Sequence, residues 1–172
     1  MTTLQGFTDG SYDYRHQYDI VDWRGPLPGL TINSGSILHF LLQHPKGKAM
    51  ASLIAKTQLA GFYNDPQSCF TLFVPVNLQG VKCMDSYTAQ QLLLLHSLPF
   101  SACYSFLKSS HMMFLDTRMT GRKILLENIN TTSPTLDRCA QIVSQVQVGG
   151  SMVYFITSPL RLDGNPLAND SA

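Results

Sequence analysis

The sequence predicts an α+β fold for the chain after residue 33. Apolar residues recur at helical spacing in the first part of this region, whereas the later part consists of short runs in which apolar and polar residues alternate. The links between these segments are short and contain the turn formers Gly, Pro and Asn. Helices that come first and strands that come later indicate α+β, and not a regular alternation of the two.

Two helices are expected near the start of this region. Ser36 is a good N-cap for residues 37–43, a short apolar helix that ends before Pro45. From Lys48 onward apolar residues again recur at helical spacing, and Gly61 ends that pattern. We therefore expect a second helix between Lys48 and Gly61.

A strand and a third helix follow. Residues 69–76 form a β-rich run that is stopped by Pro75. Either Asp85 or Ser86 caps the next helix, which runs to His96 and carries its apolar residues on one side. We expect this helix to bury that side against the rest of the domain.

The second half of the chain is predicted to be strands joined by tight turns. The turns are Thr120-Gly121 and Gly149-Gly150, and the latter is a two-residue hairpin signal. After Cys139, apolar residues alternate with glutamines, which is typical of a half-buried strand. The expected strands are 112–115, 122–127, 139–148 and 151–157, with a polar loop at 128–134.

Residues 1–33 differ in composition from the rest. They combine aromatic with acidic side chains and end in the segment Gly-Pro-Leu-Pro-Gly at 25–29, which breaks regular structure. We expect an aromatic N-terminal arm and linker over residues 1–33. A single domain is predicted over residues 34–162, followed by a C-terminal tail over residues 163–172.

The arm is the best candidate for a protein interface. Tyr and Trp bury a large area while keeping one polar group, and for this reason they concentrate at interfaces. The alternative is that the aromatic side chains of the arm fold back on their own domain. The tryptophan, which lies near the linker, is the one most expected to do so. The candidate binding residues are Tyr12, Tyr14, Tyr18 and Trp23.

Low charge restricts the classes of partner. Charged residues are 13% of the chain, about half the usual share, and the net charge is +1. Twelve basic residues scattered along the chain do not form the basic face that nucleic-acid binding requires. A hydrophobic content of 44% argues against disorder for most of the chain. The expected partners are other proteins, and not nucleic acid.

Membrane insertion and secretion are not expected. The longest aliphatic run is Leu92–Leu95, far shorter than the ~20 residues that cross a bilayer. The start of the chain lacks the basic and then apolar pattern of a signal peptide. We expect an intracellular or virion location.

The four cysteines do not predict a metal site. Their spacing contains no Cys-x-x-Cys pair, so zinc is not expected. We expect four reduced and mostly buried thiols. Two disulfides are the alternative, and the sequence does not choose among the possible pairings. The residues concerned are Cys69, Cys83, Cys103 and Cys139.

Catalytic motifs have little support. The chain has neither a Gly-x-Ser-x-Gly elbow nor a glycine-rich loop that ends in Lys-Ser or Lys-Thr. His39 and His44 are five residues apart with Pro45 next, which is a poor arrangement for a metal pair. We expect no enzyme activity, cofactor or metal. A catalytic site assembled from distant residues remains the alternative.

The order of three motifs resembles a known family. Residues 70–77, Phe-Thr-Leu-Phe-Val-Pro-Val-Asn, resemble the first signature of the fasciclin (FAS1) domain. Residues 93–99 resemble its central Tyr-His motif, and residues 149–157 lie where its second signature is expected. The resemblance covers about residues 34–162. It implies N-terminal helices packed on a mostly antiparallel β-sheet or wedge.

The resemblance also implies structural roles. In the family, the histidine equivalent to His96 packs inside and forms a hydrogen bond to the backbone near the first signature. The family pattern makes Asn77 the nearest candidate for a side-chain hydrogen-bond partner of His96. Leu95, Tyr154 and Thr157 depart from the customary Tyr, His and Asp. These departures put any inherited adhesion-receptor site in doubt. The family-motif residues are Phe73, Pro75, Asn77, His96 and Pro99.

These observations predict a non-enzymatic structural module. It would act as a minor or cementing component of a larger protein assembly, such as a viral capsid. The first alternative is an extracellular cell-adhesion FAS1 module, as family members usually are. A small-ligand binder or hydrolase is a remote third.

Overall fold

The computed structural model describes residues 30–129 and 133–164, which divide into two compact units. Unit 1 comprises the described residues up to Ser68, together with Leu78–Gln90 and Val148–Gly150. Unit 2 comprises Cys69–Asn77, Gln91–Gln147 and the described residues from Ser151 onward. The α+β prediction is confirmed, since helices accompany a seven-stranded sheet. Most of the predicted arm and tail lies outside the described residues.

Short helices form unit 1. The Ser36 hydroxyl accepts a hydrogen bond from the His39 N–H at 3.0 Å, which confirms the predicted cap. Leu38, Leu41 and Leu53 are fully buried, as the helical spacing of the apolar residues requires. The helices are α2 (Ile37–Gln43), α3 (Lys48–Ala55), α4 (Ala60–Tyr63) and the 3₁₀ helix η2 (Val81–Cys83).

The predicted helix from Lys48 to Gly61 was wrong in its extent. Helix α3 ends at Ala55, and Gly61 lies inside α4. The Thr57 hydroxyl donates to the Ile54 carbonyl at 2.7 Å and accepts from the Leu59 N–H at 3.1 Å. These local bonds replace helical ones and turn the chain.

The link between α2 and α3 requires glycine. A Cβ atom on Gly47 would lie 2.8 Å from the Leu41 carbonyl oxygen and 2.9 Å from the Leu41 Cα. Both atoms belong to backbone and cannot move aside. The absence of a side chain at this position therefore allows the two helices to follow each other closely.

Asn64 fastens the entry of the chain to unit 1. Its Oδ1 accepts from the Asn33 N–H at 2.8 Å, and its Nδ2 donates to the Thr31 carbonyl at 2.8 Å. The Asn33 side chain returns a bond of 2.9 Å to the Asn64 carbonyl. Because Asn64 is almost fully buried, these bonds hold the last residues of the predicted linker in place.

Helix α5 (Ser86–Leu95) starts in unit 1 and ends in unit 2. Asp85 is its N-cap, because a carboxylate oxygen of Asp85 accepts from the Thr88 N–H at 2.7 Å. The short helix α6 (Tyr104–Leu107) was not predicted.

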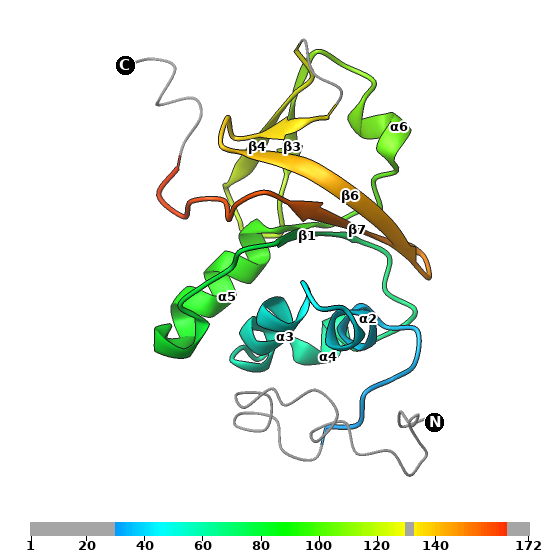
Figure 1. Ribbon diagram of the computed structural model, residues 1–172, viewed down its shortest axis with the longest axis vertical. Coiled ribbons are helices and arrows are strands. Elements are labelled where there is room, and N and C mark those ends of the chain that lie inside the picture. Colours follow the sequence, from blue (N-terminus) through cyan, green and yellow to red (C-terminus); the bar gives the residue numbers. More distant parts are fainter. Residues whose placement is uncertain (1–29, 130–132, 165–172) are drawn as a thin grey trace. The chain divides into compact units, whose positions relative to one another are not determined.

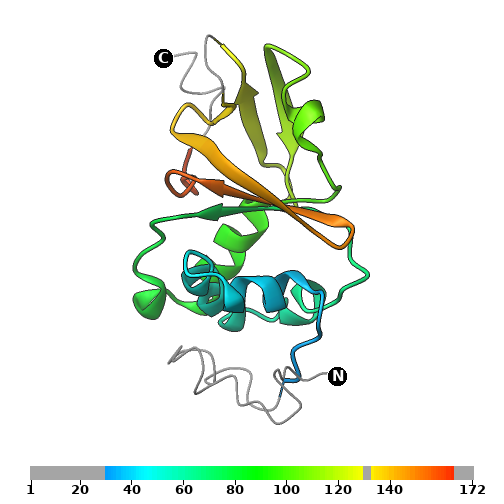
Figure 2. The same cartoon turned by 45° about the vertical axis from the view of Figure 1, so that its right-hand side comes forward.

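The sheet belongs to unit 2. Its order is β2-β1-β7-β6-β5-β4-β3, and β6 and β7 run beside each other as a long hairpin (Figures 1 and 2). Strands β1 and β7 are parallel, so the sheet is mixed, although its other paired strands with a recorded register are antiparallel. The strands are β1 (Thr71–Pro75), β2 (Ser97–Leu98), β3 (Met112–Asp116), β4 (Lys123–Glu127), β5 (Thr135–Leu136), β6 (Ala140–Val148) and β7 (Ser151–Ile156).

The order of elements departs from the simple sequence of helices and then strands. Strand β1 precedes α5, and it pairs with β7 near the end of the chain. Strands β2 and β5 have two residues each, too few to show a period in the sequence. The core of unit 2 is continuous and includes Phe73, Leu95, Leu98, Leu115, Ile124, Leu126, Leu136, Ile142, Tyr154 and Ile156.

Candidate interaction surface

The four aromatic residues predicted to form an interface all lie outside the described residues. Tyr12, Tyr14, Tyr18 and Trp23 belong to residues 1–29. Their role as binding residues therefore stays a prediction. The described residues direct attention to a different part of the molecule.

His96 is a core residue with both ring nitrogens occupied. Its Nδ1 donates to the Leu92 carbonyl at 2.8 Å, which leaves Nε2 to accept from the Leu160 N–H at 3.0 Å. The side chain is fully buried, and burial lowers the pKa of His96 to about 4. The imidazole is thus neutral. The expected bonds to Asn77 and to the backbone near residues 70–77 were wrong, because the ring bonds the backbone of Leu92 and Leu160 instead.

The other family-motif residues divide into buried and exposed ones. Phe73 is fully buried in β1, where its ring centroid lies 5.8 Å from that of Tyr154. Pro75 is buried at the end of β1, opposite Ile156 of β7. Asn77 and Pro99, by contrast, are exposed.

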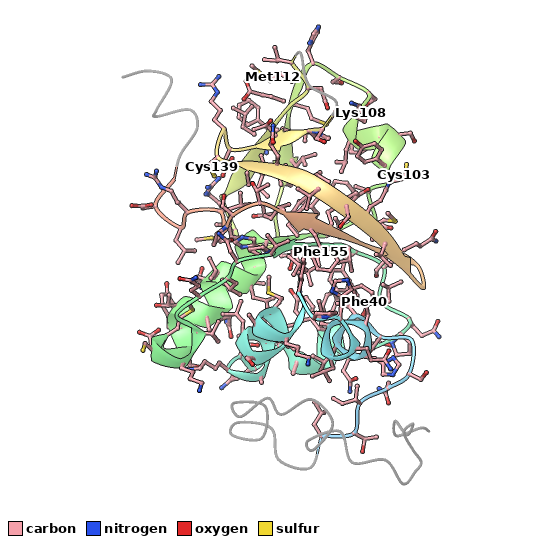
Figure 3. All side chains as sticks on the ribbon, in the orientation of Figure 1. Phe40, Cys103, Lys108, Met112, Cys139 and Phe155 are labelled. Atoms are coloured by element: carbon pink, nitrogen blue, oxygen red, sulfur yellow. The ribbon has the colours of Figure 1, made fainter. Side chains whose placement is uncertain are left out.

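The prediction of mostly buried thiols was wrong. Cys69, Cys83, Cys103 and Cys139 are all exposed, and no disulfide joins them. Cys103 Sγ lies 3.2 Å from Ser105 Oγ, and this hydrogen bond lowers the pKa of the Cys103 thiol. Cys83 ends η2, the other three cysteines lie just before regular elements, and the core does not need any of the four (Figure 3 labels Cys103 and Cys139).

Two kinds of site have no counterpart in the described structure. Within residues 30–129 and 133–164, no three His, Cys, Asp or Glu side chains gather in a way that could hold a metal ion. None of the helices in the same residues combines the length and the apolarity that a membrane crossing needs.

The strands β3–β6 share a face, here called the outer face, which is exposed on β3 and β6 but buried at Leu125 and Glu127 of β4. The register pairs Met112 with Glu127 and Phe114 with Leu125, and side chains directly opposite each other lie on the same face. The register of β4, β5 and β6 extends this face through Thr135. The outer face comprises Met112, Phe114, Asp116, Lys123, Leu125, Glu127, Thr135, Gln141, Val143 and Gln145.

Large apolar side chains are exposed on the outer face. Met112, Phe114 and Val143 are 48%, 39% and 53% exposed. Their strands alternate, so that Met113, Leu115 and Ile142 turn toward the core on the other side. The exposed residues come from both β3 and β6, which lie on either side of β4 and β5.

Charged side chains accompany these apolar residues. Lys123 forms an ion pair with Asp116 directly opposite it. Both side chains are exposed, so this pair adds little to stability. The surface thus has apolar residues with a polar margin, which is the composition of a protein interface.

The turn between β5 and β6 has an unusual backbone. Asp137 and Arg138 have φ angles of 51° and 58°, a region that glycine and asparagine prefer. Positive φ at both central residues, with the Cys139 N–H bonded to the Leu136 carbonyl at 3.0 Å, is the geometry of a tight hairpin turn. The residues that usually signal this turn are absent, so the sequence did not predict it.

Side-chain bonds stabilise this turn. The Asp137 carboxylate accepts from the Leu125 N–H at 2.8 Å and forms an ion pair with Arg122 at 2.7 Å. The Asp137 N–H donates to the Leu125 carbonyl at 2.8 Å. Arg138 forms an ion pair with Glu127 at 3.1 Å. The turn is thereby fastened to β4 despite its backbone strain.

Comparison with known proteins adds no further constraint. No protein-family model matches the chain, and no curated protein matches it.

Sequence reasoning missed the outer face, although part of the signal was present. Val143 interrupts the glutamines on the polar face of β6, and the four residues from Met112 to Leu115 are apolar on both faces. The face became visible only when the register placed these strands in one sheet.

Proposed function

We propose that this chain is a non-enzymatic protein-interaction module that serves as a minor or cementing component of a larger assembly, such as a viral capsid. The outer face is the observation that carries the proposal. It combines exposed Met112, Phe114 and Val143 with only a few charges, and such residues are favoured where proteins meet.

The composition of the whole chain supports the same function. Charged residues are only 13%, and Glu127 is the only glutamate. Lys and Glu are depleted at the centres of interfaces. A chain with a net charge of +1 is poorly protected against association. This low-charge composition suits a protein whose surface is covered by partner proteins.

The state of His96 supports a role other than catalysis. A general acid or base must reach a reacting group and titrate near the working pH. His96 has no exposed surface, both of its nitrogens are engaged, and its pKa is about 4. It suits a structural role.

We also propose that the fold is a divergent FAS1-like one. The support is the order of the three sequence motifs and the burial of Phe73, Pro75 and His96. The adhesion function that is usual in the family is less favoured, because Leu95, Tyr154 and Thr157 depart from its motifs.

Site-specific photo-cross-linking tests the proposed function. A photoreactive residue replaces Phe114 or Val143 in the full chain, and a matched control places it at Thr120, an exposed polar position in the turn before β4. Cross-linking in the native assembly should join both outer-face positions to other protein chains. The Thr120 position should give few such products.

The aromatic arm is tested in the same assembly. Deletion of residues 1–24 should leave the remainder folded and weaken incorporation into the assembly. If all cross-links from the outer face and from the arm remain within the chain, the proposed function is wrong.

A further inference from the structure

Strand β3 is an open edge of the sheet. It is the last strand in the order, with β4 as its single neighbour. The opposite edge, β2, has two residues and both are buried. Met112, Phe114 and Asp116 of β3 are exposed instead. Among the strands of residues 30–129 and 133–164, β3 is thus the one long and accessible edge strand.

The hydrogen-bond pattern shows which backbone groups face this edge. The Asn128 N–H donates to the His111 carbonyl at 2.8 Å, and the Thr117 N–H donates to the Arg122 carbonyl at 3.3 Å. In an antiparallel ladder, bonded and non-bonded pairs alternate. Met113 and Leu115 therefore bond to β4 as well. The N–H and C=O groups of Met112, Phe114 and Asp116 point away from β4, toward the open edge.

The sequence of β3 protects this edge only weakly, through the single charge of Asp116 at its end. Natural edge strands carry Lys, Pro, a bulge or a very short length, which prevent pairing with another chain. The run Met-Met-Phe-Leu-Asp has none of these, and its register with β4 has no bulge. Such an edge is a template for one more strand.

We infer that β3 pairs with β3 of a second copy of this chain, antiparallel and about a two-fold axis at Phe114. This inference rests on the proposed function and names a second copy of the chain as the partner of the β3 edge, while the outer face on β6 stays uncovered in this contact. Phe114 lies opposite Phe114 of the second copy, and Met112 lies opposite Asp116. The two sheets become continuous through six backbone hydrogen bonds, two for each of the three pairs.

The register follows from the direction of the backbone groups. Only residues whose N–H and C=O groups face the edge can form the bonded pairs, so shifts occur in steps of two residues. The register centred on Phe114 pairs all three such residues of each strand. A shift of two residues in either direction leaves one of the three without a partner. The centred register is therefore the most stable.

Charge favours the same arrangement. Asp116, the acidic end of β3, comes to lie beside Met112 of the second copy, so no like charges are opposed. The net charge of +1 gives little general repulsion between copies.

The contact is small, which predicts a reversible dimer. One five-residue strand per copy buries less than the ~1,200 Å² of a standard stable interface. We expect dissociation constants of about 1–100 μM, so that dimers form at high local concentration, as in an assembly. Dilution should return the chain to monomers.

Sedimentation velocity on the reduced full chain tests the dimer over a range of concentrations. The wild type should shift from monomer to dimer. Phe114→Lys places two lysines opposite each other and should weaken the dimer at least ~10-fold. Val143→Lys is the control, because it adds the same charge to the outer face on β6, away from the edge. Val143→Lys should leave the dissociation constant of the dimer within about twofold of the wild-type value. Thermal unfolding should show that both variants fold.

A mixture of two oppositely charged Phe114 variants should restore the dimer. Such a rescue excludes the explanation that each substitution only damages the fold. Phe114→Asp alone should also remain monomeric, whereas an equimolar mixture with Phe114→Lys should form heterodimers. In amide hydrogen exchange on the wild type, Met112, Phe114 and Asp116 should gain protection with concentration. Met113 and Leu115, already bonded to β4, should not change.

Three outcomes overturn the inference: a wild type that stays monomeric at the highest concentration, a dimer that Phe114→Lys leaves intact, or protection that rises at Met113 and Leu115 instead. A monomeric wild type that still cross-links to other proteins through Phe114 would leave the proposed function standing while the self-pairing fails.

Discussion

The strands β1 and β7 differ from β3 and β6 in how many of their faces are buried. All five residues of β1 are buried, and five of the six residues of β7 are buried. In β3 and in the first half of β6, burial alternates with exposure. The first pair is apolar on both faces, as is usual for parallel strands, and the second pair has one face for the core and one for solvent.

The difference separates two uses of the same sheet. Substitutions in β1 and β7 act on packing from both sides, so their effect should be large and purely on stability. Substitutions on the outer face of β3 and β6 should leave the fold intact and change what it binds. The following predictions test this division, beginning with the largest effect.

The largest difference is expected between two phenylalanines. Phe73→Ala removes a fully buried ring in β1 and should lower the free energy of unfolding by about 3–5 kcal/mol. Phe114→Ala removes a ring that is 39% exposed in β3 and should cost less than ~1.5 kcal/mol. Urea unfolding, in dilute solution so that association does not contribute, measures both. Equal losses would show that the two regions do not differ.

The next effect concerns the turn that fastens β5 and β6 to β4. Asp137→Ala removes the acceptor of the Leu125 N–H and the carboxylate beside the largely buried Arg122 guanidinium, and should cost about 2–4 kcal/mol. Arg122 then keeps only its bonds to the Lys123 and Arg161 carbonyls. The matched control is Asp116→Ala, which breaks an exposed ion pair with Lys123 and should cost less than ~1 kcal/mol. If both variants unfold at the same urea concentration, the turn carries no special stabilisation.

Acid should destabilise the fold through His96. Burial lowers its folded pKa to about 4, below the value of about 6.5 in an unfolded chain. The unfolded state therefore binds more protons in this interval, so stability is complete above pH ~6.5 and falls as the pH drops toward ~4. Between pH 7.5 and 5 the loss from His96 should be about 2 kcal/mol.

A variant separates His96 from other groups. Burial also lowers the pKa of His39, which adds a loss in the same direction. His96→Gln keeps a donor and an acceptor but does not titrate, so its unfolding free energy should depend less on pH than that of the wild type. An unchanged pH dependence would exclude His96 as the cause.

The smallest expected effect comes from one hydroxyl in β7. Tyr154 Oη donates to the Ala102 carbonyl at 2.6 Å, and burial raises the pKa of Tyr154. Tyr154→Phe leaves this buried carbonyl without its donor and should cost about 1–2 kcal/mol in thermal or urea unfolding. Tyr87→Phe, at a side chain that is 73% exposed, should have no measurable effect. If Tyr154→Phe leaves the free energy of unfolding unchanged, the Ala102 carbonyl finds another hydrogen-bond donor.

Local signals were sufficient where the physical cause is local. The Ser36 cap, the Asp85 cap and the Gly149-Gly150 hairpin were predicted because each depends on a few adjacent residues. The period of the residues around Ile142 likewise located β6. These elements account for much of the secondary structure.

The sequence failed where distant residues decide. The turn at Asp137 and Arg138 depends on bonds to Arg122, Leu125 and Glu127, which no window around the turn contains. Strand β5 exists because β4 and β6 lie on either side of it. The outer face was missed for the same reason, since register is set by pairing and not by the strand alone.

The parallel pairing of β1 with β7 has a consequence for folding. Phe70 bonds to Ser151 across 81 positions of the chain, and the closure of so long a loop is slow. During synthesis β1, which is buried throughout in the folded chain, leaves the ribosome long before β7 exists. The antiparallel pairs of β3 with β4 and of β4 with β5 are far more local and can form first. We therefore expect β1 to be the segment that needs a chaperone, and the folding rate to be limited by its capture.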